Sequence, residues 1–184
     1  MSDQFLHLHD GQLSVVVSTR GNIPSIVYWG SYLGDTPLNS KQFERTVLGG
    51  GIDLDPPLGI VPQSHDGWLG TPGIEGCFTD GSGSFPQFAI TSLTHTTTSA
   101  TFTLRDVGLE LELDLNLEIH ASGLLNVSGS LTNRSPKKYF LHSLRIALPV
   151  PARAQEILTL GGRWGMEFGE QRSPWIHSEL SISN

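Results

Sequence analysis

The clearest pattern along the chain is a strict alternation of apolar and polar residues between Gly108 and Asn133. Leucines and one isoleucine occupy the odd positions from 109 to 119, and acidic residues, Asn or His occupy the even positions from 110 to 120. Successive side chains of a strand point to opposite faces of a sheet, whereas a helix would spread these leucines around its circumference. The alternation resumes after residues 121–123. The pattern predicts a long, half-buried β-hairpin.

Similar alternation marks five further segments, each bounded by Gly, Pro, Ser or Asn. They are Gln12–Thr19, Ile23–Trp29, Gln87–Thr94, Ala100–Arg105 and Tyr139–Val150. No segment shows the apolar stripe of an amphipathic helix. Strands this numerous, joined by short turns without intervening helices, favour antiparallel sheets packed face to face. We therefore expect an all-β fold in which residues 1–184 form one β-sandwich domain.

The region from Leu48 to Gly83 breaks the alternation and is rich in Gly and Pro. A loop of this length in a compact domain is uncommon, and it is usually either functional or disordered. Several large apolar residues favour an ordered, packed loop over a solvated linker, namely Ile52, Leu54, Ile60, Val61, Trp68 and Leu69.

Charge and composition limit the kinds of partner that the chain can bind and the cellular compartments that it suits. The 184 residues include 18 acidic and 11 basic side chains, for a formal net charge of −7 without a run of Lys or Arg, which argues against binding nucleic acid. No apolar stretch reaches the roughly 20 residues of a membrane helix. The first residues lack the basic and apolar regions of a signal peptide, and a single cysteine, Cys77, suits a reducing compartment. We expect a cytoplasmic protein that does not span a membrane.

Motifs for cofactors and metals are missing from the sequence. Its glycine clusters lack the Lys-Ser or Lys-Thr of a phosphate loop, no dinucleotide-type glycine pattern opens a helix, and no Gly-x-Ser-x-Gly elbow occurs. His7 and His9 are spaced to share one face of a strand, but a metal site needs three or four converging ligands. The interpretation as ordinary surface histidines is favoured, so we predict neither a cofactor nor a metal.

Two groups of acidic residues are candidate binding sites. Glu110, Glu112 and Asp114 fall on the polar face of the predicted hairpin, where we expect a solvated surface. Asp53 and Asp55 lie in the long loop between glycines and a pair of prolines. They could present a carboxylate to a ligand or simply organise a turn, and the residues alone leave both alternatives open.

Three stretches of the chain resemble family-36 glycoside hydrolases, which are mostly α-galactosidases. The first is Asn22–Gly30 with Leu33-Gly34, similar to an early strand that ends in an aromatic-Trp-Gly turn. The second comprises Leu48–Gly51, Pro56–Gln63 and Gly67–Gly73 in the long loop. The third is Gly161–Phe168 followed by Gln171-Arg172, similar to a Gly-Arg-Trp-x-x-Glu motif near the end of the family's leading sandwich. Their shared order across most of the chain makes the match more specific than any one motif alone.

The resemblance implies a galactose-mutarotase-like supersandwich that precedes a (β/α)8 barrel in a longer enzyme. Such enzymes retain anomeric configuration, and both catalytic aspartates belong to the barrel. This sequence contains neither the Lys-x-Asp nucleophile motif nor alternating strands and helices, so it supplies no catalytic residue and should be inactive alone. The implied partners are α-galactosides bound by the parent enzyme, the enzyme's own barrel and further copies of the chain in a homo-oligomer.

The resemblance also implies that a loop of the sandwich lends an Asp to the sugar pocket. Asp53 or Asp55 could take that role here, and Trp68 would be part of the packing and part of the pocket wall. Two positions depart from related sequences, with Thr71 where an Arg is usual and Gln63 where an acid is common. Contacts inherited from those two positions are therefore in doubt.

Two other functions compete with that of an accessory domain. The chain could be an independent carbohydrate-binding sandwich with Trp residues as stacking platforms, for which Trp29, Trp68, Trp164 and Trp175 are available. It could instead be purely structural and support only oligomerisation.

Overall fold

The computed structural model describes residues 5–35, 38, 40–43, 58–150 and 154–175. Eleven strands and two short 3₁₀ turns make up the regular structure of this part of the chain. The chain divides into two compact units, Met1–Pro149 and Val150–Asn184, and each is described by itself. No helix in the described ranges is long and apolar enough to cross a bilayer.

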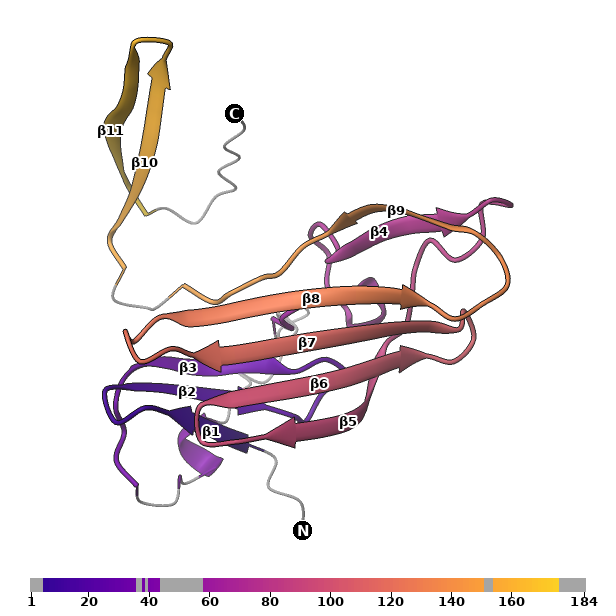
Figure 1. The fold of residues 1–184 in the computed structure, drawn as a ribbon, viewed down its shortest axis with the longest axis horizontal. Helices are drawn as coiled ribbons and strands as arrows, with labels where there is room; N and C mark the ends of the chain where they lie inside the picture. Colours follow the sequence, from indigo (N-terminus) through magenta and orange to yellow (C-terminus); the bar gives the residue numbers. More distant parts are fainter. Residues whose placement is uncertain (1–4, 36–37, 39, 44–57, 151–153, 176–184) are drawn as a thin grey trace, which may run out of the picture. The chain divides into compact units, whose positions relative to one another are not determined.

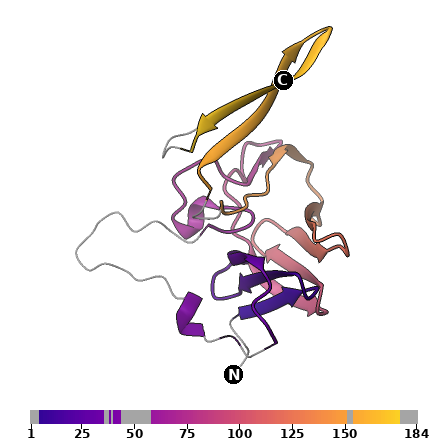
Figure 2. The same ribbon diagram turned by 90° about the vertical axis from the view of Figure 1, so that its left-hand side faces the viewer.

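The first unit contains two antiparallel meanders, which Figure 1 shows lying against each other. One sheet has the order β1-β2-β3 and consists of β1 (Phe5–His9), β2 (Leu13–Ser18) and β3 (Ser25–Ser31). The other has the order β5-β6-β7-β8 and consists of β5 (Ala89–His95), β6 (Ser99–Asp106), β7 (Leu111–Ile119) and β8 (Leu125–Asn133). The turned view in Figure 2 shows the same two layers. The predicted all-β antiparallel sandwich is confirmed.

The core between these sheets is built from the alternating residues of the predicted hairpin. Leu113 and Leu115 of β7 are fully buried, and they lie opposite Leu104 and Phe102 of β6. Leu8, Val15 and Val17 from the other sheet belong to the same buried cluster. Apolar cross-strand pairs stabilise a sheet, and their burial between layers supplies most of the folding free energy. The hairpin is confirmed, with β7 and β8 in register from Leu111↔Asn133 to Ile119↔Leu125.

The remaining elements include features that the alternation did not predict. Strand β4 (Ile74–Phe78) lies within the segment expected to be a loop and pairs with β9 (Tyr139–Leu144). The two 3₁₀ turns are Ser40–Phe43 and Ser64–Asp66. In the second unit, β10 (Glu156–Arg163) and β11 (Met166–Pro174) form a hairpin that carries the Gly-Arg-Trp motif.

The expectation of a fully solvated acidic face on β7 was wrong for Glu112. This residue is only 6% exposed, because Arg105 of β6 lies directly opposite it and Arg134 follows the end of β8. The Glu112 carboxylate lies 2.6 Å from the nearest Arg105 nitrogen and 2.7 Å from that of Arg134. The hydrogen bonds from Arg134 and then Arg105 hold the pKa of Glu112 below its ordinary value of 4.5. Long Arg side chains cover a carboxylate well, which alternation alone could not indicate.

Replacement of this carboxylate should produce a pH-dependent loss of stability. A carboxyl whose folded-state pKa is depressed stabilises the fold above its unfolded-state pKa, and that stabilisation disappears as the pH falls through the folded value. We expect Glu112→Gln to lower the Tm most at neutral pH, with a difference from the wild type that shrinks below about pH 4.5. Thermal unfolding between pH 7 and pH 3 would test this, with exposed Glu118→Gln on the same strand as control. A difference that stays constant across this range would contradict it.

Candidate functional site

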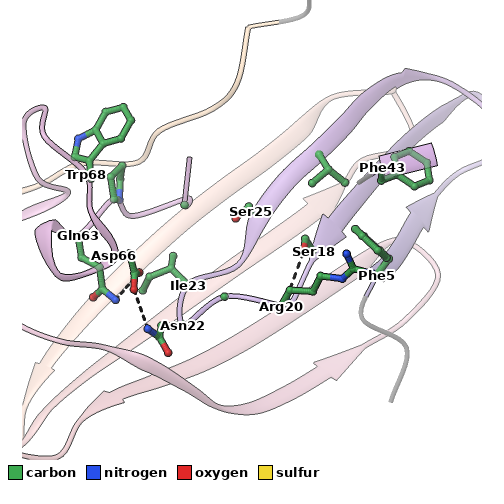
Figure 3. A pocket seen from close by; sticks show the side chains of 14 residues that line it. Phe5, Ser18, Arg20, Asn22, Ile23, Ser25, Phe43, Gln63, Asp66 and Trp68 are labelled. Atoms are coloured by element: carbon green, nitrogen blue, oxygen red, sulfur yellow. Dashed lines mark hydrogen bonds between the residues drawn. The ribbon is translucent and has the colours of Figure 1, made fainter. Parts of the chain in front are cut away.

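The described part of the first unit contains a cavity of about 580 Å³, shown in Figure 3. Its wall comes from the β1–β3 sheet, the 3₁₀ turn at Ser40–Phe43 and the segment from Gly59 to Trp68. Small-molecule sites usually measure about 300–1,000 Å³ and combine apolar walls with a few polar groups. The lining follows that mixture, with Phe5, Ile23, Val27, Phe43, Pro62 and Trp68 as large apolar residues and Ser18, Arg20, Asn22, Ser25, Gln63 and Asp66 as polar ones.

The segment that carries Gln63, Asp66 and Trp68 is held by buried side chains and backbone hydrogen bonds. Ile60 and Val61 are almost fully buried in the core. The Ile60 amide donates to the Pro24 carbonyl at 2.9 Å, and the Ile60 carbonyl accepts from the Ala147 amide at 2.8 Å. The burial of Ile60 and Val61 agrees with the expectation of a packed loop, whereas Leu69 is 98% exposed. Ile52 and Leu54 lie outside the described residues.

Gln63 fastens this segment to the start of β5. Its side chain is buried, and its amide oxygen accepts the Phe88 N–H at 2.9 Å while its amide nitrogen donates to the Phe88 carbonyl at 3.0 Å. The same nitrogen donates to Asp66 Oδ2 at 2.8 Å. A buried amide is costly unless its donors and acceptor are satisfied, and here all of them have partners. The primary amide is required, because a carboxylate cannot donate to the Phe88 carbonyl.

Asp66 ends the short 3₁₀ turn and lines the cavity with a carboxylate that is fixed from two sides. Its Oδ2 accepts from Gln63, and its Oδ1 accepts from the Asn22 side-chain amide at 2.8 Å (Figure 3). Asn22 is itself tied to β5, since its carbonyl accepts the Ile90 N–H at 3.0 Å. Gln63 and Asn22, which both donate to this carboxylate, are therefore both hydrogen-bonded to the backbone around the first residues of β5.

Trp68 follows Asp66 by two residues, is half-buried and forms part of the cavity wall. Its indole Nε1–H donates to the Thr71 carbonyl at 2.9 Å, so the polar edge of the ring is already bonded. A Cβ on Gly70 would stand about 3.0 Å from three atoms of the indole, which shows that the glycine backbone packs closely on the ring. The turn from Trp68 to Thr71 therefore holds the indole in place.

Arg20, Phe5 and Phe43 lie together at another part of the wall (Figure 3). The Arg20 guanidinium carbon lies 4.6 Å from the centre of the Phe5 ring, and the Phe5 and Phe43 ring centres are 5.8 Å apart. Cation–π contacts of this type keep a guanidinium against an aromatic surface. Within the described lining, Asp66 is the one carboxylate and Arg20 the one guanidinium.

Of the predicted site residues, the structure places Trp68 in the cavity. Asp53 and Asp55 lie outside the described residues. Sequence reasoning missed Asp66 and Asn22, and it noted Gln63 only as a departure from related sequences. The available signal was the Asp66-Gly67-Trp68 sequence, which places a carboxylate two residues before an aromatic ring in a turn.

The histidine pair has surroundings that differ from those of a metal site. The His7 and His9 ring centres are 4.7 Å apart, and Tyr32 lies 5.0 Å from His9. His7 Nε2 shares a 2.8 Å hydrogen bond with Ser14 Oγ. Burial, and next the neighbouring His9, lowers the pKa of His7. No three His, Cys, Asp or Glu side chains converge as metal ligands in the ranges that the structure covers.

Comparison with known proteins places this fold in a family. Residues 22–184 match the model of the glycosyl hydrolase family 36 N-terminal domain. The chain belongs to this family. A curated α-galactosidase of Escherichia coli is 29% identical to it over 185 residues, which cover 100% of this chain and 26% of the relative.

Solved family-36 structures share the fold of the chain. An α-galactosidase of Geobacillus stearothermophilus, AgaA in complex with raffinose, superposes with a TM-score of 0.75 at 18% identity over 94% of this chain and 28% of its own. The galactosidase domain of the α-galactosidase-sucrose kinase AgaSK gives a TM-score of 0.76 at 13% identity, over 95% of this chain and 28% of its own. The family-36 chain described here thus spans about a quarter of the length of these relatives.

The Gln63 amide provides a direct test of how the cavity wall is held. In Gln63→Glu, a carboxylate oxygen would face both the Phe88 carbonyl and the Asp66 carboxylate, so two hydrogen bonds become repulsive contacts. An unsatisfied buried polar group costs about 1–3 kcal/mol, and we expect a loss of that order in the free energy of unfolding at pH 7. Urea denaturation measures it, with Gln87→Glu at an exposed position as control. Identical urea midpoints for Gln63→Glu and wild type would show that the amide is not needed.

Proposed function

We propose that this chain acts as the N-terminal domain of an α-galactosidase, supports a catalytic barrel carried elsewhere in the longer polypeptide, and lends residues to the sugar pocket. The observation that carries the proposal is the family match, which extends over residues 22–184. The relatives are named α-galactosidases, and one of them was crystallised with raffinose. The proposed substrates are therefore terminal α-galactosides.

The composition of the cavity supports a role in binding instead of bond cleavage. Glycoside hydrolysis with retention requires two carboxyl groups about 5–5.5 Å apart, one as nucleophile and one as acid and base. The described cavity lining offers one carboxylate, Asp66. Cleavage would then depend on the barrel, and this domain would contribute hydrogen-bond acceptors and an aromatic surface.

Carbohydrate binding by the chain alone is a second candidate function, and the cavity beside Trp68 is the observation that favours it. The cavity is lined entirely by residues of the first unit and combines an indole wall with polar groups. The two candidates are compatible, since an accessory domain can keep weak affinity for the sugar that its parent enzyme cleaves.

Further copies of the chain and the barrel are the other proposed partners. Strand β9 supports this part of the proposal, because Phe140 and Leu141 are 52% and 45% exposed on it. Neighbouring exposed apolar side chains of this kind are typical of protein interfaces.

The proposed α-galactosidase activity and the contribution of the long loop can be tested together. The longer enzyme should release galactose from raffinose. We expect Asp53→Ala or Asp55→Ala to reduce kcat/KM roughly threefold to tenfold with a nearly unchanged Tm, because a lost acceptor of a sugar hydroxyl costs about 0.5–1.5 kcal/mol. Steady-state kinetics measures kcat/KM of each variant, and thermal unfolding measures its Tm. A longer enzyme that leaves raffinose intact refutes the proposed function, and unchanged kinetics in both variants would make the loop architectural.

Trp68 should affect both the sugar affinity and the stability of the enzyme. Its indole is half-buried and lines the cavity, and an aromatic contact is worth about 0.5–1.5 kcal/mol beyond its buried area. We expect Trp68→Ala to raise the KM for raffinose about threefold to tenfold and to lower the Tm. Leu69→Ala is the matched control, since the neighbouring Leu69 is 98% exposed and absent from the lining. Equal KM values for the two variants would exclude Trp68 from the pocket wall.

A further inference from the structure

Within the described residues of the second unit, the β10–β11 hairpin has no buried core (Figure 1). None of residues 154–175 is buried, and all nine residues of β11 are exposed. A two-stranded hairpin is marginally stable in water by itself, and three or more strands are usually needed. The hairpin therefore gains stability from any further strand that joins it.

The outer edge of β11 presents backbone groups to such a strand. Among the described strands, β11 pairs with β10 alone. The Trp175 N–H donates to the Gln155 carbonyl at 2.7 Å, so these two residues form a hydrogen-bonded pair in the register of the two strands. Hydrogen-bonded and non-hydrogen-bonded pairs alternate along an antiparallel ladder. The odd positions from 169 to 173 thus turn their N–H and C=O groups toward β10, whereas Glu170 and Arg172 turn theirs toward the free edge.

A second copy of the same strand can occupy this edge. Two identical edges related by a two-fold axis across the sheet pair antiparallel, and the same contact occurs twice. A pairing centred on Gln171 sets Glu170 of each copy opposite Arg172 of the other. Both residues turn their backbone groups outward, so each of these pairs can exchange two backbone hydrogen bonds. The two hairpins would then form one continuous antiparallel sheet.

The charges of β11 favour this register over its neighbours. The Arg172 guanidinium lies 3.7 Å from the Glu170 carboxylate and 3.4 Å from that of Glu156, so the three side chains share one face of the hairpin. Centring the pairing on Gln171 opposes unlike charges twice, whereas centring it on Glu170 or Arg172 would oppose like charges. Centring it on Arg172 would also place Pro174, which has no N–H, opposite an outward-facing residue.

The same register brings apolar residues together at both ends of the paired strands. Phe168 of one copy reaches the end of the strand in the other, where Pro174 and Trp175 lie. Phe168 is 78% exposed and Trp175 is 42% exposed. Their burial between two copies would add an apolar contribution to the backbone and charge pairs.

We propose that the outer edge of β11 is an interface between two copies of this chain, paired antiparallel about Gln171. A second copy is the occupant because the edge is complementary to itself in backbone hydrogen bonds, in charge and in its apolar ends. The outer edge of β10 suits this role less, since Gly161 and Gly162 have no side chains for cross-strand contacts. The proposal defines a surface for the further copies expected under the proposed function, and it does not depend on α-galactosidase activity.

Sedimentation velocity of the 184-residue chain over a concentration series tests the charge pairing. We expect a monomer–dimer equilibrium with a dissociation constant on the order of 0.1 mM. Glu170→Arg and Arg172→Glu should each weaken dimerisation at least about tenfold, because each variant opposes like charges twice. An equimolar mixture of the two variants should dimerise as the wild type does, since every cross-strand pair then joins unlike charges. Glu118→Arg is the control for the change in net charge, because Glu118 is exposed on β7, and it should dimerise normally.

Cysteine cross-linking tests the register. Gln171 would lie opposite its own copy in a non-hydrogen-bonded pair, where Cα atoms are about 4.5 Å apart and within the range of a disulfide. In a Cys77→Ser background, Gln171→Cys should therefore form a covalent dimer on mild oxidation. Ser173→Cys is the control on the same edge, since its copies would be offset by roughly 13 Å along the strands. Thr159→Cys is the control on the other edge, because Thr159 pairs with Gln171 inside the hairpin.

The results separate the second copy from other occupants of the edge. Covalent dimers from Thr159→Cys and not from Gln171→Cys would assign the contact to β10 and overturn the proposal. A chain that stays monomeric at millimolar concentration, or a mixture of charge variants that stays monomeric, would also overturn it. If position 171 is then shielded from thiol reagents only in the longer enzyme, the barrel covers this edge instead.

Hydrolysis of raffinose by the longer enzyme tests the proposed function separately. An enzyme that cleaves raffinose while the chain shows no dimer refutes the interface and leaves the function standing. A chain that dimerises through β11 while the longer enzyme leaves raffinose intact supports the interface and refutes the function.

Discussion

The candidate site depends on a side-chain amide that replaces missing backbone pairing. Phe88 directly precedes β5, and its backbone N–H and C=O need partners because the residue is buried. The Gln63 side chain bonds both of these groups, much as a neighbouring strand would. The same amide then reaches Asp66 and fixes the carboxylate at the cavity. One buried residue thus joins the loop, the sheet and the site.

The sandwich makes this attachment rigid. Phe88 is 2% exposed and belongs to the core cluster that also contains the leucines of β7. Displacing the Phe88 backbone would disturb side chains packed between two sheets, where interiors tolerate little change in volume. The position of the Asp66 carboxylate is therefore coupled to core packing through Gln63. The core of the sandwich thus fixes the position of a carboxylate that lies at the edge of the domain.

The sequence allowed accurate prediction of elements whose signal is local. Alternating leucines identified the β7–β8 hairpin because the period of a strand is visible within one segment. Strand β4 was missed, since Ile74–Phe78 is short, has Gly76 at its centre and pairs with a strand 61 to 70 residues later in the chain. The burial of Glu112 was missed for a related reason, because it depends on Arg105 and Arg134 from other strands. Asp66 was overlooked because its value as an acceptor comes from partners 44 and 3 residues away.

The central claim is our proposal that this chain serves as the N-terminal domain of an α-galactosidase and lends residues to its sugar pocket. A crystal structure of the longer enzyme with bound raffinose tests this most directly. The account predicts that residues of the long loop, Trp68 among them, contact the galactose ring. A sugar pocket formed by the barrel alone, with this loop remote from the sugar, would contradict it.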